Sequence, residues 1–192
     1  GAIMKLLAEG RRVGVLDPTS LQAYIGSGGY RALTRAFSLG AAGVIAELEA
    51  SKLMGRGGAA FPTGTKWRAV ANAPGLPKHI VVKADESEPG TFKDRILLEN
   101  DPFAVIEAVT IAGFATGAAK GWIYLRGEYP LVAERLTGAL AQAREAGFLG
   151  ERIARSSFSF DIELRRGAGA YICGEETALF NSLEGYRGEP RQ

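Results

Sequence analysis

Glycines and cationic side chains are concentrated in the stretch GRGGAAFPTGTKW, residues 55–67. Glycine loses more conformational freedom on folding than any other residue, so such a cluster indicates a backbone that must pass where side chains do not fit. A close approach to a ligand is one reason, because backbone N–H groups can surround a phosphate. An ordinary tight turn with solvated cations is the alternative. The groups that would hold a phosphate are Gly55, Gly57 and Gly58 with the cations Arg56 and Lys66.

Two known phosphate-binding patterns fit this stretch poorly. The letters GRGGAA match the dinucleotide fingerprint G-x-G-x-x-A, but the residues before them are typical of a helix, whereas the fingerprint follows a strand. No Ser or Thr follows Lys66, so the stretch is not a Walker-type phosphate loop either.

A second group of chemically capable residues is acidic. ADESEPGTFKDR places Asp85, Glu86 and Glu88 directly after the apolar run Ile80 to Val82. Carboxylates bind hard metal ions, but no histidine or matching acidic loop supports a metal site here. They also accept hydrogen bonds from ribose hydroxyls or ring N–H groups. An acidic turn that caps a neighbouring helix is the third interpretation.

The third stretch, GAGAYICGEET, combines a glycine loop with two glutamates. Glu175 and Glu176 would occupy the first turn of a following helix, where they favour the helix dipole but repel a phosphate. A ligand here would therefore present hydroxyls or amides, and Tyr171 would add a flat face; helix capping alone is the alternative. Cys173 is interpreted as a buried apolar residue, since the chain's one histidine, His79, is distant in sequence. One positive loop and two acidic segments together indicate a nucleotide ligand.

The elements that must position these stretches follow an α/β order. Strands are predicted around residues 80–82, 121–128 and 158–167, with helices beginning at Asp101–Pro102 and at Pro130 between them. Helices are also predicted after Asp17, which would be an N-cap with Pro18 at the first helical position, and over residues 30–39 and 41–53. Alternating strands and helices are typical of a parallel sheet with crossover helices, which binds ligands beyond the carboxyl ends of its strands.

Composition narrows the possible functions. The 192 residues are 46% hydrophobic and 23% charged with a net charge of +2, as in a globular domain with a real core. That charge gives no concentrated basic face for nucleic acid. No apolar run is long enough to span a membrane and no leader pattern is visible. The use of one cysteine in 192 residues predicts a cytoplasmic location. A single cysteine excludes an internal disulfide and a cysteine-ligated iron–sulfur cluster within this sequence.

The strings GRGGAAFPTGTKW, ADESEPGTFKDR, YLRGEYP and GAGAYICGEETALFNSLEG resemble the flavin-carrying, NADH-binding subunit of respiratory complex I. They are equally similar to the diaphorase subunit of NAD-linked hydrogenases and the beta subunit of soluble NAD-dependent formate dehydrogenases. The resemblance begins near residue 20 and runs to the end. It implies a Rossmann-like FMN-binding domain, here residues 55–192, after a helical segment at 1–54.

The resemblance also assigns roles to residues. It implies that the 55–66 stretch is the FMN-phosphate loop and that Phe61 stacks on the NADH adenine. Glu88 would face the nicotinamide nucleotide, and Glu176 would hold the dinucleotide. Direct hydride transfer between the two cofactors needs no acid or base from the protein. The remaining flavin contacts implied are Asp85, Glu86, Ser87, Tyr171, Gly174 and Glu175.

Three departures from the family pattern affect these expectations. Ala60 replaces a glycine in the loop, and Ala69 replaces an aromatic that helps to sandwich adenine. Lys83 stands where the family has an asparagine that touches the flavin, so either the flavin potential changes or the contact is lost.

The resemblance implies an NADH dehydrogenase (diaphorase) module that passes a hydride between NADH and FMN and feeds the iron–sulfur chain of a larger complex. Its partners would be other subunits, including an iron–sulfur thioredoxin-like one, with any membrane attachment through them. The family's second flavin segment, ubiquitin-like domain and 4Fe-4S domain would lie beyond residue 192, so these residues alone are expected to be inactive. A cofactor-free structural fragment is the alternative.

Overall fold

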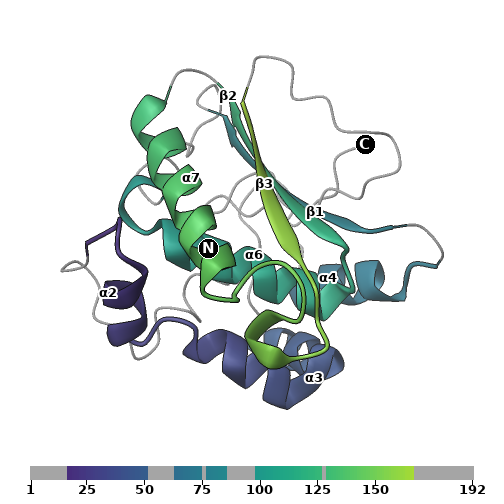
Figure 1. Ribbon diagram of the computed structural model, residues 1–192. Helices are drawn as coiled ribbons and strands as arrows, with labels where there is room; N and C mark the ends of the chain where they lie inside the picture. The colour runs from purple at the N-terminus through teal and green to yellow at the C-terminus, as the bar shows by residue number, and fades with distance from the viewer. Residues whose placement is uncertain (1–16, 52–62, 75–76, 86–97, 127–128, 167–192) are drawn as a thin grey trace.

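The computed structural model describes residues 17–51, 63–74, 77–85, 98–126 and 129–166. Within them, helices and a three-stranded sheet pack around one core (Figure 1). The helices are α2 (Leu21–Gly26), α3 (Arg31–Ala50), α4 (Thr63–Asn72), α6 (Pro102–Thr116) and α7 (Pro130–Glu145), with a short 3₁₀ helix, η1 (Ile153–Arg155). The strands are β1 (His79–Asp85), β2 (Lys120–Arg126) and β3 (Asp161–Arg166).

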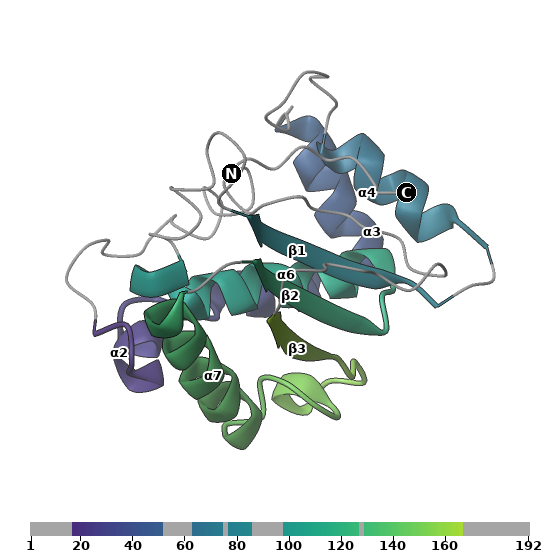
Figure 2. The ribbon, with the colours of Figure 1, turned by 90° about the horizontal axis from the view of Figure 1, so that it is seen from above.

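The strands form a parallel sheet in the order β1-β2-β3. His79 pairs with Lys120 and Asp85 with Arg126, and in the next pair Lys120 lies opposite Asp161. The crossover helices α6 and α7 cover one face of this sheet (Figures 1 and 2). The predicted α/β architecture with a parallel sheet and crossover helices is therefore confirmed.

Helix α6 is the centre of the core. It begins as predicted, with Asp101 at the N-cap and Pro102 in the first turn, and it ends at Gly117, whose φ of 74° suits glycine. The helix is buried almost all round because it packs against β1 and β2 on one side and against α3, α4 and α7 on others. Because α6 has neighbours on all these sides, its sequence is apolar and has no polar stripe.

Helix α3 consists of two helical segments joined at Gly40, which has a φ of 77°. This agrees with the two helical patterns in the sequence. The second segment buries Val44, Ile45 and Leu48 on one face, as its spacing predicts. Because α3 packs against both α4 and α6, the N-terminal helices share one core with the sheet.

The predicted N-cap of the first helix is wrong. Helix α2 begins at Leu21, and its N-cap is Ser20, whose hydroxyl accepts a hydrogen bond from the Ala23 N–H at 3.1 Å. Asp17 instead accepts from the backbone N–H of Thr19 at 2.9 Å and from the Thr19 hydroxyl at 2.6 Å. The carboxylate is thus used in a local turn before the helix, which lowers the Asp17 pKa.

Part of the predicted glycine loop is also helical. Thr63 to Lys66, which the sequence analysis placed in a loop, form the first turn of α4. Helix α4 is held in the core by Trp67 and Val70, which are 1% and 6% exposed. Burial of a tryptophan against two neighbouring helices outweighs the glycine and β-branched residues at the helix start.

Candidate functional site

The three strands finish at one edge of the sheet. Asp85 ends β1 and pairs with Arg126 at the end of β2, and Arg166 ends β3 beside Leu125. This carboxyl edge is where open parallel sheets bind their ligands. The acidic stretch that begins at Asp85 and the glycine stretch that begins at residue 167 both leave the sheet from it. The structure therefore places Asp85 and Arg166, the strand ends from which these segments start, at one edge of the sheet although they are about 80 residues apart in sequence.

Two of the sequence-predicted site residues lie in described elements. Lys66 is in the first turn of α4, and Asp85 is the last residue of β1. The structure describes their place in these elements and not their side chains. The other predicted residues lie outside the described residues and stay predictions: Gly55, Arg56, Gly57, Gly58, Phe61, Glu86, Ser87, Glu88, Tyr171, Gly174, Glu175 and Glu176.

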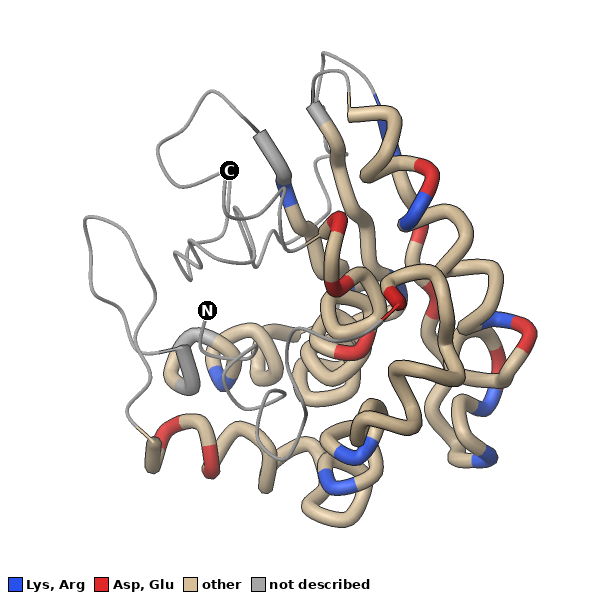
Figure 3. The backbone as a smooth tube through the Cα atoms, turned by 90° about the vertical axis from the view of Figure 1, so that its left-hand side faces the viewer, with Lys and Arg blue, Asp and Glu red and all other residues tan. Residues whose placement is uncertain are grey.

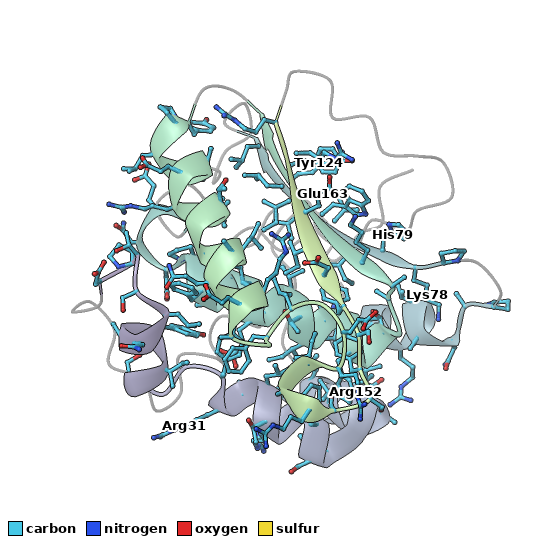
Figure 4. All side chains as sticks on the ribbon, viewed as in Figure 1. Arg31, Lys78, His79, Tyr124, Arg152 and Glu163 are labelled. Atoms are coloured by element: carbon cyan, nitrogen blue, oxygen red, sulfur yellow. The ribbon has the colours of Figure 1, made fainter. Side chains whose placement is uncertain are left out.

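The sheet face opposite α6 and α7 carries a polar row near this edge. Lys83 of β1 pairs with Tyr124 of β2, which pairs with Arg165 of β3. Strand alternation places the row on the face opposite the buried Ile123 and Leu125, and Figure 4 shows Tyr124 on that side. Sequence analysis noted Lys83 alone, because only the register shows that two cations flank one phenol.

Trp122 organises the next part of the same face. The Lys120 ammonium lies 4.4 Å from its ring centroid and the Arg165 guanidinium 5.1 Å, distances typical of cation–π contacts. Lys120 also bonds to the Glu163 carboxylate at 2.6 Å, and this bond lowers the Glu163 pKa. The face is thus polar and charged around Lys120, Glu163 and Arg165, whereas Val81, which pairs with Trp122 on the same face, is fully buried.

His79 lies at the opposite, amino edge of the sheet. Its Nδ1 accepts a hydrogen bond of 2.6 Å from the Trp122 indole N–H, and the two rings are nearly coplanar. Its partner in the sheet is Lys120, the first residue of β2. The histidine therefore lies at the end of β1 away from the carboxyl edge. In the described part of the chain, no cluster of histidine, cysteine or acidic residues is suited to a metal ion.

An ion pair joins α3 and α4, the helices before and after the first glycine-rich stretch, which begins at residue 55. Glu49 of α3 accepts hydrogen bonds from Arg68 of α4, with the shortest N–O distance at 2.6 Å. The bond to Arg68 lowers the Glu49 pKa, and the same bond raises the pKa of Arg68. The ends of the stretch are therefore connected by side chains as well as by the shared packing of α3 and α4.

A parallel sheet of three strands whose crossover helices cover one face defines an α/β domain, and domains of this class bind ligands at the carboxyl ends of their strands. The particular family follows from sequence comparison. A family profile described as the Nuo51 FMN-binding domain matches residues 48–192. The chain belongs to this family, as its motifs suggested.

Named relatives agree with this assignment. One NADH-quinone oxidoreductase subunit of Aquifex aeolicus is 51% identical over 172 residues, which are 90% of this chain and 40% of that protein. The NADP-reducing hydrogenase subunit HndC of Solidesulfovibrio fructosivorans is 49% identical over 180 residues, 94% of this chain and 36% of that one. The chain thus spans about two-fifths of the length of such relatives.

A solved structure shows the same fold. The crystal structure of an NAD⁺-reducing [NiFe]-hydrogenase in the H₂-reduced state aligns with a TM-score of 0.56 and 40% sequence identity. The alignment covers 79% of this chain and 25% of that chain.

A membrane-spanning helix would need greater length and apolarity than any helix among the described residues has.

Proposed function

We propose that this chain is part of an electron-input module in which NADH and FMN exchange a hydride at the carboxyl edge of the sheet. The observation that carries this proposal is the convergence of all three strand ends at that edge, together with the family match. When bound, FMN accepts a hydride from nicotinamide and can pass electrons on singly. The protein then supplies binding, orientation and charge rather than an acid or a base.

The described residues fit an FMN ligand. FMN has an anionic phosphate at one end and a flat ring with hydrogen-bonding edges at the other. Next to the carboxyl edge lie the cations Lys83 and Arg165 and the Tyr124 phenol, and Arg165 is also paired with Glu163 at 3.1 Å. The polar character of this face also agrees with a ligand that carries many acceptors.

Each predicted segment has a proposed role at this edge. The phosphate would lie at Gly55 to Gly58. Lys66, in the first turn of α4, would donate a hydrogen bond to it. The acidic segment from Asp85 to Ser87 would contact the flavin ring. Phe61, Glu88 and Glu176 would contact NADH. The second loop's wall, Tyr171, Gly174 and Glu175, would be shared by both cofactors.

The electrons would leave through a 4Fe-4S cluster in a further part of the same protein and then through partner subunits of a multi-subunit oxidoreductase. Among those partners we propose an iron–sulfur subunit of thioredoxin-like fold. We also propose a cytoplasmic location. We propose no contact with nucleic acid, since acidic and basic residues are interspersed over the described backbone (Figure 3).

Flavin titration of the full natural chain, freed of cofactor, tests the proposal. Lys66→Ala and Arg56→Ala should each weaken FMN binding by about 1–3 kcal/mol, the range for a charge-assisted hydrogen bond. Arg31→Ala is the matched control, because Arg31 is an exposed cation at the start of α3 and away from the sheet edge (Figure 4). Unchanged FMN affinity in both test variants would refute the phosphate assignment. Failure of the wild-type chain to bind FMN would favour the cofactor-free structural alternative.

A further inference from the structure

In the ion pair between Glu49 and Arg68, two nitrogens of the guanidinium fork contact one carboxylate, and both of them reach Oε1. The Arg68 Nε lies 3.1 Å from each carboxylate oxygen of Glu49, and the Nη2 lies 2.6 Å from one of them. The Glu49 and Arg68 side chains are 33% and 45% exposed, so water screens the pair only in part. A planar fork fixes direction as well as distance, which a single lysine contact would not do.

The pair connects the ends of one segment. Glu49 lies in the last turn of α3 and Arg68 in the second turn of α4, so all of residues 55–62 lie between them. Each partner follows a deeply buried residue, Leu48 on α3 and Trp67 on α4, both 1% exposed. The buried residues hold the helices against the core, and the fork adds a restraint on their outer sides.

The same restraint acts on Lys66. This residue precedes Arg68 by two positions on α4, so any rotation or sliding of α4 along α3 that breaks the fork also moves the Lys66 backbone. The affinity of a preformed anion site depends on donors that are in place before the ligand arrives.

We propose that Glu49 and Arg68 are positioning residues for the FMN phosphate: their fork fixes α4 against α3 and so fixes where the backbone of Lys66 lies. This inference rests on the proposed function. It goes beyond that function because neither residue would itself contact the flavin.

The direction in which one substitution changes the affinity for FMN separates a positioning role from simple electrostatics. Glu49→Gln removes a negative charge near a phosphate site, so electrostatics alone would tighten FMN binding. A positioning role has the opposite consequence, because the neutral amide no longer holds the guanidinium fork. A partly exposed ion pair contributes a modest free energy, so we expect a roughly two- to fivefold loss of affinity.

The experiment compares FMN with riboflavin, which has the same ring but no phosphate. Dissociation constants for both are measured by flavin fluorescence quenching on the full natural chain after cofactor removal. In Glu49→Gln and Arg68→Gln, the preference for FMN over riboflavin should fall roughly two- to fivefold while riboflavin affinity stays constant. The exchanged pair, Glu49→Arg with Arg68→Glu, should recover at least half of the loss.

Asp161→Asn is the matched control. Asp161 accepts from Arg144 in a similar exposed pair, with an Nε–Oδ1 distance of 3.0 Å, but at the amino edge of the sheet. The preference of the Asp161→Asn variant for FMN over riboflavin should not change. A Glu49→Gln variant that binds FMN as tightly as wild type or more tightly would overturn the positioning role, even if its melting temperature falls. A wild-type chain with no preference for FMN would overturn the phosphate site itself, and with it this inference.

Discussion

Glu107 gives the strongest stability prediction, because this carboxylate is buried and fully used. It lies in the middle of α6 and is 1% exposed. Its Oε2 accepts the Leu33 N–H at 2.9 Å, and its Oε1 accepts the Tyr30 N–H at 2.9 Å and the Tyr24 hydroxyl. Tyr30 is the N-cap of α3 and makes no side-chain cap bond of its own. Glu107 therefore caps α3 from a different helix.

Glu107→Gln keeps the shape of the side chain and removes its charge. An amide has one oxygen, so its NH₂ group must face either the Leu33 N–H or the donors from Tyr24 and Tyr30. At least one buried backbone or hydroxyl donor then loses its acceptor. A lost charge-assisted bond and an unsatisfied buried donor each cost about 1–3 kcal/mol. The negative charge at the helix N-terminus contributes further stability, so we expect a total loss of about 2–4 kcal/mol.

Urea and thermal unfolding of the full chain measure this loss. For a domain of this size, each kcal/mol shifts the melting temperature by about 2–4 °C, so the expected fall is about 4–16 °C. Amide hydrogen exchange at Leu33 should accelerate more than exchange within β2. Glu134→Gln is the matched control, because Glu134 is exposed on α7. A loss below about 0.5 kcal/mol for Glu107→Gln, equal to that of an ordinary surface change, would refute the capping role.

Three further predictions concern a phenol, two glycines and the proposed NADH contact. Burial, and then the charge of Glu107, raise the pKa of the Tyr30 phenol, whose hydroxyl finds no acceptor among the described residues. Because the phenol has a higher pKa in the folded state than in the unfolded state, the protein loses stability as the pH rises above the unfolded pKa of about 10. Tyr30→Phe should therefore leave the free energy of unfolding at neutral pH unchanged or higher. It should also reduce the loss of that free energy at alkaline pH, as measured by unfolding curves. A Cβ on Gly113 would lie 2.4 Å from the buried Phe160 ring, whereas one on Gly138 would meet nothing within 4 Å. Gly113→Ala should thus destabilise by about 1–3 kcal/mol and Gly138→Ala should stabilise by up to about 1 kcal/mol in urea titrations; the same sign for both would contradict this packing argument. Glu176→Gln should raise KM for NADH at constant flavin content, and a variant that only loses stability would point to helix capping.

Much of the fold could be predicted from local patterns. The start of α6 at Asp101 and Pro102, the break at Gly40 and the buried face of α3 depend on interactions within a few residues of each other. The sheet was predictable for the same reason, since alternating strand and helix patterns leave few topologies open. The family match of residues 48–192 likewise follows from linear motifs.

Choices between competing local signals could not be predicted in the same way. Both Asp17 and Ser20 are good N-cap residues; the structure uses Ser20, and Gln142 of α7 meets the start of α2. The Gln142 side chain accepts the Leu21 N–H at 3.1 Å and donates to the Thr19 carbonyl at 2.8 Å. A residue more than 120 positions away thus completes the hydrogen bonds at the start of the helix.

By itself the sequence determined the family, the α/β order and the segments that carry the proposed FMN and NADH contacts, because these depend on composition, periodicity and linear motifs. The tertiary structure alone decided which polar groups meet. No pattern in the sequence reveals that Glu107 caps α3, since the groups that donate hydrogen bonds to it are 74 to 83 residues away. The row of Lys83, Tyr124 and Arg165 exists only through strand register. Hydrogen bonds and ion pairs act over a few ångströms in space, whatever the separation along the chain.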